Sequence, residues 1–234
     1  MTRRHNLFKF YPDRRWAEAF LEGELLFRSL AYSRDYEDAA TRGDHLEGTA
    51  VFRPAGGLVV NNQTQGKNFI LTGHTFVSRA KHEEIFVFCV SRSMTDEIRD
   101  RFGAVACVRV LNIPQFCARI GAALPSGAAL PPDAAFPGRP GHTRIGQRVT
   151  YYSETEGGSP RWALPDLITS SKIDRYAWQD EFRLVFSLTG ALRFENVDVS
   201  VVPDDAAVPP NPTQHATYLV QAGSLRDICR IQEI

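Results

Sequence analysis

Two residues near the start of one strand-forming segment are of the types that act in catalysis. The segment is QDEFRLVFSL at 179–188, and the period-two geometry of a strand separates its apolar residues from its polar ones. One face holds Phe182, Leu184, Phe186 and Leu188, and the other holds Gln179, Glu181 and Arg183. We expect the apolar face in the core, with Gln179 and Glu181 side by side on the opposite face. Glu181 is then either a charge on a solvated strand or the centre of a site.

Two earlier strands carry residues that could complete such a site. In LFKFY at 7–11, Lys9 and Tyr11 share one face. In ELLFRS at 24–29, Arg28 shares a face with an apolar residue and precedes Ser29, so we expect Arg28 to need an acidic or anionic partner. With the Gln-x-Glu pair of Gln179 and Glu181, these groups predict a pocket for a ligand that bears phosphate and an aromatic ring. The alternative is a structural ion-pair network built from the same Lys, Arg and Glu residues.

An acidic segment, YEDAATRGDHLEGT at 36–49, offers a third interpretation. Clustered carboxylates can hold a divalent metal for nuclease chemistry. Their spacing matches no metal-binding loop, so we favour charge-assisted bonds with nearby arginines and predict no metal site. The carboxylates are Glu37, Asp38, Asp44 and Glu47, and the arginines are Arg34 and Arg42.

Composition excludes several classes of protein. The 27 basic and 27 acidic residues cancel, which argues against strong nonspecific binding to nucleic acid. No apolar run approaches the roughly 18 residues of a membrane span, and the first residues lack a signal-peptide pattern, so we expect a cytoplasmic protein with no membrane partner. The four cysteines are widely spaced, with no zinc or redox motif, and three of them lie in apolar runs typical of small core residues.

Periodicity predicts an α+β fold in one domain, 1–234, with mixed, mostly antiparallel sheets and a few short helices. The unbroken apolar run at 85–90 indicates a strand buried on both faces. The Pro-, Gly- and Ala-rich stretch at about 124–142 is expected to be a long loop, and 203–212 a second one. Helices are expected at 12–24 and 94–103. Further strands are expected at 48–54, 56–62, 74–80, 83–93, 106–112, 147–154, 180–188 and 196–202, with a helix or strand at 224–232.

The order of these segments resembles a large bacterial family of unknown function. Its members open with a Leu-[Tyr/Phe]-Lys-[Tyr/Phe] strand and carry a late Trp-x-x-Glu-x-Arg signature. The matching segments here are LFKFY at 7–11, GELLFRSLAYSRDYEDAATRGDHLEGT at 23–49, FVFCVS at 86–91, VTYY at 149–152 and WQDEFR at 178–183.

A more distant resemblance is to the ADP-ribosyltransferases, because a basic residue lies on an early strand, Arg-Ser on the second strand and Gln-x-Glu on a late strand. The resemblance implies a split sheet and NAD as cosubstrate. Glu181 would be the catalytic glutamate and Gln179 would orient the nucleophile. The cofactor would be held by Lys9, Tyr11, Arg28, Ser29 and Tyr32. The chain departs from the family in having only FRS where a Ser-Thr-Ser triplet is usual, and in having no His or Arg at the usual position of the first strand.

Three functions therefore stand open. The first is an NAD-dependent ADP-ribosyltransferase-like enzyme that cleaves the bond between nicotinamide and ribose, as a toxin or phage-defence effector. Its transition state is oxocarbenium-like, so Glu181 would stabilise the positive charge. The acceptor would be a protein or nucleic acid. The second is a non-catalytic ligand- or protein-binding domain, and the third is a metal-dependent nuclease.

Overall fold

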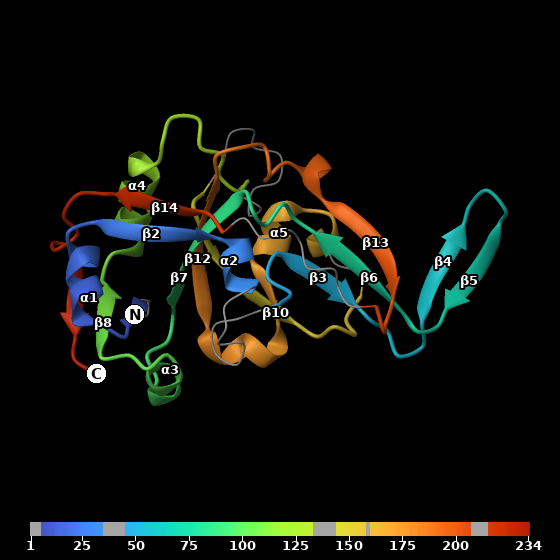
Figure 1. Cartoon of the computed structure of the whole chain (residues 1–234), viewed down its shortest axis with the longest axis horizontal. Coiled ribbons are helices and arrows are strands. Elements are labelled where there is room, and N and C mark those ends of the chain that lie inside the picture. The colour runs from blue at the N-terminus through green and yellow to red at the C-terminus, as the bar shows by residue number, and fades with distance from the viewer. Residues whose placement is uncertain (1–5, 35–44, 133–143, 158–159, 207–214) are drawn as a thin grey trace, which may run out of the picture.

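The structure is a computed structural model that describes residues 6–34, 45–132, 144–157, 160–206 and 215–234. It confirms an α+β fold with mostly antiparallel, open sheets and short helices. Figure 1 shows one large sheet, a second smaller sheet beside it, and a hairpin that projects beyond the smaller sheet.

The large sheet is built around β7, the apolar strand at Ile85–Ser91. Its other strands are β1 (Leu7–Tyr11), β2 (Glu24–Ser29), β8 (Ala106–Val110), β9 (Gly146–Arg148), β12 (Glu181–Ser187), β14 (Thr217–Gln221) and β15 (Cys229–Gln232). On one side, β12 pairs with β7 along its whole length, and β9 pairs with β12.

On its other side, β7 has two partners that meet it at different points. β1 pairs with β7 only at Phe8 and Ser91, while β2 pairs only through Arg28 with Val87 and Ser29 with Phe86. Beyond β1 the sheet extends through β8 to β15, and beyond β2 it extends to β14. The sheet therefore divides into two branches, which leave β7 at these two points.

Helix α1 (Arg14–Leu21) covers one face of this sheet. It begins at Asp13, whose side chain accepts a hydrogen bond from the backbone N–H of Arg15 at 2.8 Å, and it buries Ala17, Phe20 and Leu21. Gly23, at φ +91°, follows the helix, and a Cβ there would lie 2.0 Å from the carbonyl oxygen of Gly223. Only glycine permits the chain to turn into β2 at this point.

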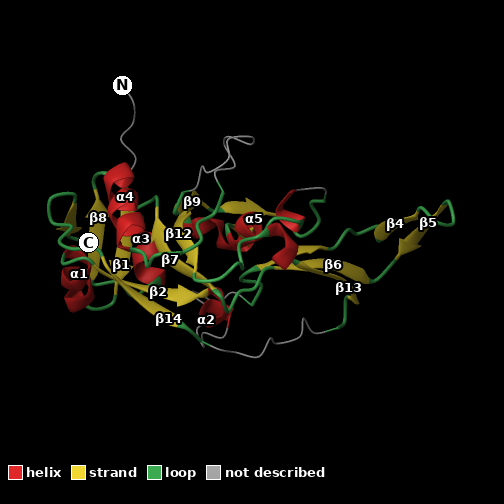
Figure 2. Cartoon of the chain, turned by 90° about the horizontal axis from the view of Figure 1, so that it is seen from above, coloured by secondary structure: helices red, strands yellow, loops and turns green. Residues whose placement is uncertain are grey.

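The smaller sheet contains β3 (Thr49–Phe52), β6 (His74–Arg79) and β13 (Asp198–Pro203), in the order β13–β6–β3. β4 (Leu58–Asn62) and β5 (Lys67–Leu71) form the projecting hairpin, which we call the arm (Figures 1 and 2). β10 (Thr150–Tyr152) and β11 (Ser171–Ile173) form the parallel pair. The remaining helices are α2 (Leu30–Arg34), α3 (Asp96–Arg101), α4 (Ile113–Ala123), α5 (Pro165–Thr169) and the 3₁₀ turns η1 (Pro160–Trp162), η2 (Asp174–Gln179) and η3 (Phe194–Asn196).

Several expected boundaries are wrong. The segment at 147–154 contains two strands in different sheets, β9 and β10, rather than one. The late strand begins at Glu181 because Asp180 takes a left-handed conformation, φ 39°, that ends η2; Gln179 therefore lies on the 3₁₀ turn. Leu188 follows the strand and is 45% exposed rather than in the core. Sequence periodicity missed α4, β5 and β14. Most of the expected loop at 124–142 lies outside the described residues.

Candidate functional site

Glu181 lies in a buried cluster of charged side chains centred on Arg183. The Arg183 guanidinium binds the Glu47 carboxylate through both Nη atoms, at 2.6 and 2.8 Å, and donates a hydrogen bond to the backbone oxygen of Thr169 at 2.5 Å. It also donates to Glu181, from Nε at 3.1 Å and from Nη2 at 3.3 Å. Arg183 is therefore held by two carboxylates at once.

Lys172 completes the cluster from the neighbouring strand β11. Its Nζ lies 3.1 Å from Glu181 Oε2 and 3.5 Å from Glu47 Oε2, and donates to Gln179 Oε1 at 2.8 Å. The four charges therefore cancel, and we call Glu47, Lys172, Gln179, Glu181 and Arg183 the charge cluster. Each of its side chains is at most 7% exposed.

Local structure holds Glu181 in this position. The backbone N–H of Glu181 donates to the Tyr151 hydroxyl at 2.8 Å, on β10. One residue earlier, Asp180 is tied to the end of β7, because its side chain accepts a hydrogen bond from Ser93 Oγ at 2.5 Å and pairs with Arg92 at 3.2 Å. Ser91 Oγ donates to the backbone oxygen of Gln179 at 2.8 Å. The turn before β12 is thus fixed on both sides.

Electrostatics favour the charged form of Glu181. Burial alone raises the pKa of this carboxyl, but the attraction of Arg183 and Lys172 outweighs burial, and the pKa lies well below its usual range. Burial likewise lowers the pKa of Arg183, and its two carboxylate partners raise it well above the ordinary value. The Cys89 thiol donates a hydrogen bond to the Glu181 carboxylate. Burial raises the pKa of this thiol to about 12. Both Glu181 and Arg183 therefore stay ionised at neutral pH.

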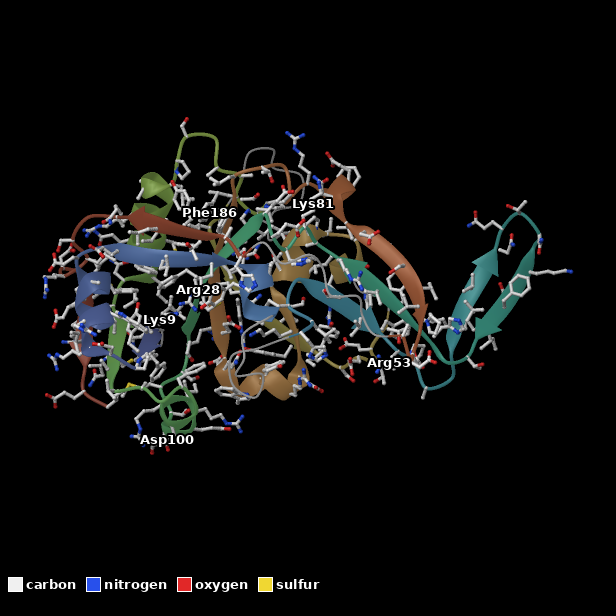
Figure 3. The ribbon with its side chains drawn as sticks, in the orientation of Figure 1. Lys9, Arg28, Arg53, Lys81, Asp100 and Phe186 are labelled. Carbon is white, nitrogen blue, oxygen red and sulfur yellow. The ribbon has the colours of Figure 1, made fainter. Side chains whose placement is uncertain are left out.

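Lys9 and Tyr11 share one face of β1, as expected, but this is the opposite face of the sheet from Glu181. Pairing from Phe8 through Ser91 to Glu181 puts those three residues on one face, and Lys9 and Tyr11 alternate with Phe8. Lys9 Nζ donates to the backbone oxygen of Cys89 at 2.7 Å and lies 4.6 Å from the Phe88 ring centre. Lys9 (Figure 3) therefore hydrogen-bonds to β7 at Cys89, between the points where β1 and β2 pair with β7.

Tyr11 packs in the core rather than beside a pocket. Its ring meets Phe20 edge-on at 6.4 Å, and burial raises the pKa of its hydroxyl well above the usual range. Lys9 and Tyr11 are therefore packed with the aromatic core under α1.

Arg28, Ser29 and Tyr32 lie on the other branch of the sheet, at β2 and α2. The Arg28 guanidinium lies 4.2 Å from the centre of the Tyr32 ring, so its partner is an aromatic face, and the described residues offer it no carboxylate. Ser29 is buried, and its hydroxyl accepts a hydrogen bond from the backbone N–H of Ala216 at 3.2 Å. Figure 3 shows Lys9 and Arg28 on the two separate strands that leave β7.

Of the acidic segment at 36–49, the structure describes only residues 45–49. Glu47 belongs to the charge cluster, while Glu37, Asp38, Asp44 and Arg42 lie outside the described residues, as does the side chain of Arg34. Within the described ranges, no three His, Cys, Asp or Glu side chains are placed to hold a metal ion.

Sequence reasoning missed Lys172 and the pairing of Glu47 with Arg183. The separation of 136 residues between Glu47 and Arg183 leaves no local signal. Lys172 lies seven residues before Gln179, on a strand of only three residues that periodicity cannot detect.

In the described part of the chain, no helix has both the length and the apolar character needed to cross a membrane. No family model, curated protein or solved structure matches the chain.

Proposed function

We propose that the protein is a non-catalytic protein-binding domain in which the Lys, Arg and Glu cluster is a structural ion-pair network. The observation that carries this proposal is the saturation of Glu181. Its two carboxylate oxygens are bound by Arg183 and Lys172, its backbone N–H by Tyr151, and the residue is 5% exposed. A glutamate that stabilises a ribosyl cation must instead face its ligand.

Reaching Glu181 would also be costly for a ligand. A ligand that displaced Arg183 or Lys172 would leave a buried charge without its partner, which costs about 3–5 kcal/mol. Both cations also bind Glu47, so displacing one of them disturbs two ion pairs. The cluster is therefore better suited to joining β12 and β11 to the turn before β3 than to binding substrate.

The binding surface in this proposal is the arm and the groove at its base. The groove has a volume of about 610 Å³ and is lined by Asn61 and by apolar residues from the arm, the smaller sheet and η1: Phe52, Leu58, Val59, Val60, Phe76, Trp162 and Val201. On the arm, Val59 pairs with Ile70 and Val60 with Phe69; Val59 is 71% and Ile70 64% exposed. Exposed apolar pairs on a hairpin that projects from the body are typical of an interaction site.

The edges of the arm are suited to pairing with another strand. Residues 58–71 hold a single charged residue, Lys67, and no proline, so they lack the usual protection of an edge strand. An isolated two-stranded hairpin is also only marginally stable in water. A further strand or an apolar surface against the arm would stabilise it.

The occupant that we propose is a second copy of this chain. The groove is lined by uncharged side chains, and the arm exposes apolar side chains and carries one charged residue, Lys67. The equal numbers of acidic and basic residues, 27 each, leave no net repulsion between copies. In a two-fold dimer each arm would lie against the groove of the other copy, so both arms would be covered at once.

Sedimentation velocity over a range of protein concentrations tests this assembly. We expect a dimer, and we expect Val59→Lys to convert it to a monomer that keeps the circular dichroism spectrum of the parent protein and loses any dependence of the melting temperature on protein concentration. The matched control is Val105→Lys, at a residue that is 66% exposed and far along the chain from the arm. A monomer at every concentration, or equal loss of dimer in both variants, would overturn the proposal.

A second candidate is the NAD-dependent transfer reaction, with Glu181 as its glutamate and Gln179 beside it. Two observations support it: the sheet branches at β7, and Gln179 and Glu181 meet at Lys172. The deciding measurement is nicotinamide release from NAD by the purified protein. We expect none. Release that disappears in Glu181→Gln, with the fold retained by circular dichroism, would replace the binding-domain proposal with the enzymatic one.

A further inference from the structure

Two arginines lie directly opposite each other on neighbouring strands of the large sheet. Arg109 of β8 pairs in register with Arg230 of β15, and on its other side Arg109 pairs with Phe8 of β1. The three side chains share one face, because directly paired residues point to the same side of a sheet. Their strand neighbours Val108, Val110 and Cys229 point to the other face, into the core that α1 covers.

This arrangement is electrostatically unfavourable by itself. Directly opposed side chains on antiparallel strands have Cβ atoms only about 4.5–5.5 Å apart, and like charges there destabilise the sheet. In the part of the chain that the structure describes, neither Arg109 nor Arg230 has a carboxylate within ion-pair distance. Asp227, three residues before Arg230 in the chain, is engaged by Arg119 at 2.5 Å.

Arg109 also has an unmet hydrogen bond. Its Nε is buried and has no acceptor. Leaving a buried donor without a partner costs about 1–3 kcal/mol, and more for a charged group. Its Nη atoms are not among the buried polar atoms that lack partners, and Arg230 is exposed, so an anion approaching from solvent can reach the ends of both guanidiniums.

We propose that Arg109 and Arg230 bind the phosphate group of a small molecule. A phosphate dianion supplies the two negative charges that the two guanidiniums lack, and its oxygens accept the paired N–H groups of each planar fork. Phe8, half-buried beside Arg109, gives the site an apolar flank against which the rest of a phosphate ester packs. The zero net charge of the protein excludes a general field for anions, so the attraction is local to this pair.

The site is independent of the proposed function. In the row of paired residues across the sheet, Glu181, Ser91, Phe8 and Arg109 follow one another, so Arg109 lies three strand spacings, about 14 Å, from Glu181. The phosphate site shares no residue with the charge cluster or with the arm. Loss of phosphate binding would therefore leave the dimer intact, and a monomeric protein could still bind phosphate.

Isothermal titration with inorganic phosphate, at constant ionic strength set by chloride, tests the site in the full chain. We expect saturable binding of one phosphate, weakened at least about tenfold by Arg230→Gln and by Arg109→Gln. The matched control is Arg148→Gln, which removes an exposed arginine on β9, at the other side of β12, and is expected to change affinity less than about twofold. Because Arg230 is exposed, its variant is expected to fold even if Arg109→Gln does not.

Adenosine monophosphate in a parallel titration identifies the source of the phosphate. Tighter binding than inorganic phosphate, lost in Phe8→Ala, assigns the site to a phosphate ester with a ring; equal binding assigns it to free phosphate. Absence of saturable binding of either probe, or equal weakening by Arg148→Gln and Arg230→Gln, would overturn the proposal.

Discussion

Replacing Glu47 by Gln is the most direct perturbation of the charge cluster. The substitution keeps the shape of the side chain but removes the charge that Arg183 binds at 2.6 and 2.8 Å and that Lys172 approaches at 3.5 Å. Breaking a buried ion pair costs about 3–5 kcal/mol, and the remaining amide oxygen can still accept one hydrogen bond, so we expect a loss near about 3 kcal/mol. That is a large share of the roughly 5–15 kcal/mol of a typical domain.

Chemical denaturation followed by circular dichroism measures this loss. A change of about 3 kcal/mol lowers the melting temperature of a chain of this length by about 6–12 °C. Glu18→Gln is the matched control, because Glu18 pairs with Arg226 at 3.1 Å on the surface, where both side chains are about half exposed. We expect the control to match the parent protein. If Glu47→Gln also matched it, the cluster would be solvated rather than buried, and Glu181 would be open to a ligand.

Two further predictions concern the charge cluster, and a third concerns two cysteines elsewhere in the core. Because the pKa of Glu181 is lowered in the folded state, unfolding takes up a proton below about pH 4.3; stability should therefore fall on acidification by up to about 1.4 kcal/mol per pH unit from this group, and acid denaturation of Glu181→Gln should show a shallower slope. Tyr151→Phe removes the acceptor for the Glu181 backbone N–H and should cost about 1–3 kcal/mol by denaturation. Burial raises the pKa of Cys107 to about 12 and of Cys117 to about 11, so thiol reagents at pH 8 should label both only after unfolding.

Alternation and apolar runs predicted much of the large sheet from the sequence. The strands at 7–11 and 24–29 have the expected bounds, and the apolar run at 85–90 is the central strand, buried on both faces. The helix expected at 12–24 is α1, which runs from Arg14 to Leu21. Alternation also placed Glu181 and Arg183 on one face of β12, and they bind each other there. These features depend on residues close together in the chain.

Features that depend on distant residues could not be predicted in this way. The face of β12 that carries Glu181 is buried because segments around Glu47 and Lys172 cover it. Hydrophobic periodicity within these short segments does not indicate which distant strand they contact. Lys9 and Arg28 could be assigned to strands but not to a common pocket, since the branch of the sheet at β7 separates them. A short 3₁₀ turn likewise took Gln179 out of the strand.

The segment Gln-Asp-Glu at 179–181, where η2 passes into β12, therefore has a structural reason for each of its residues. Gln179 binds Lys172, Asp180 ties the turn to β7 through Ser93 and Arg92, and Glu181 holds Arg183 in the cluster. The four charges cancel only when β12, β11 and the turn before β3 come together, because any one segment alone leaves buried charges unpaired. A misplaced segment is thus strongly disfavoured, so the cluster specifies how the two sheets are joined in addition to any net stability that it provides.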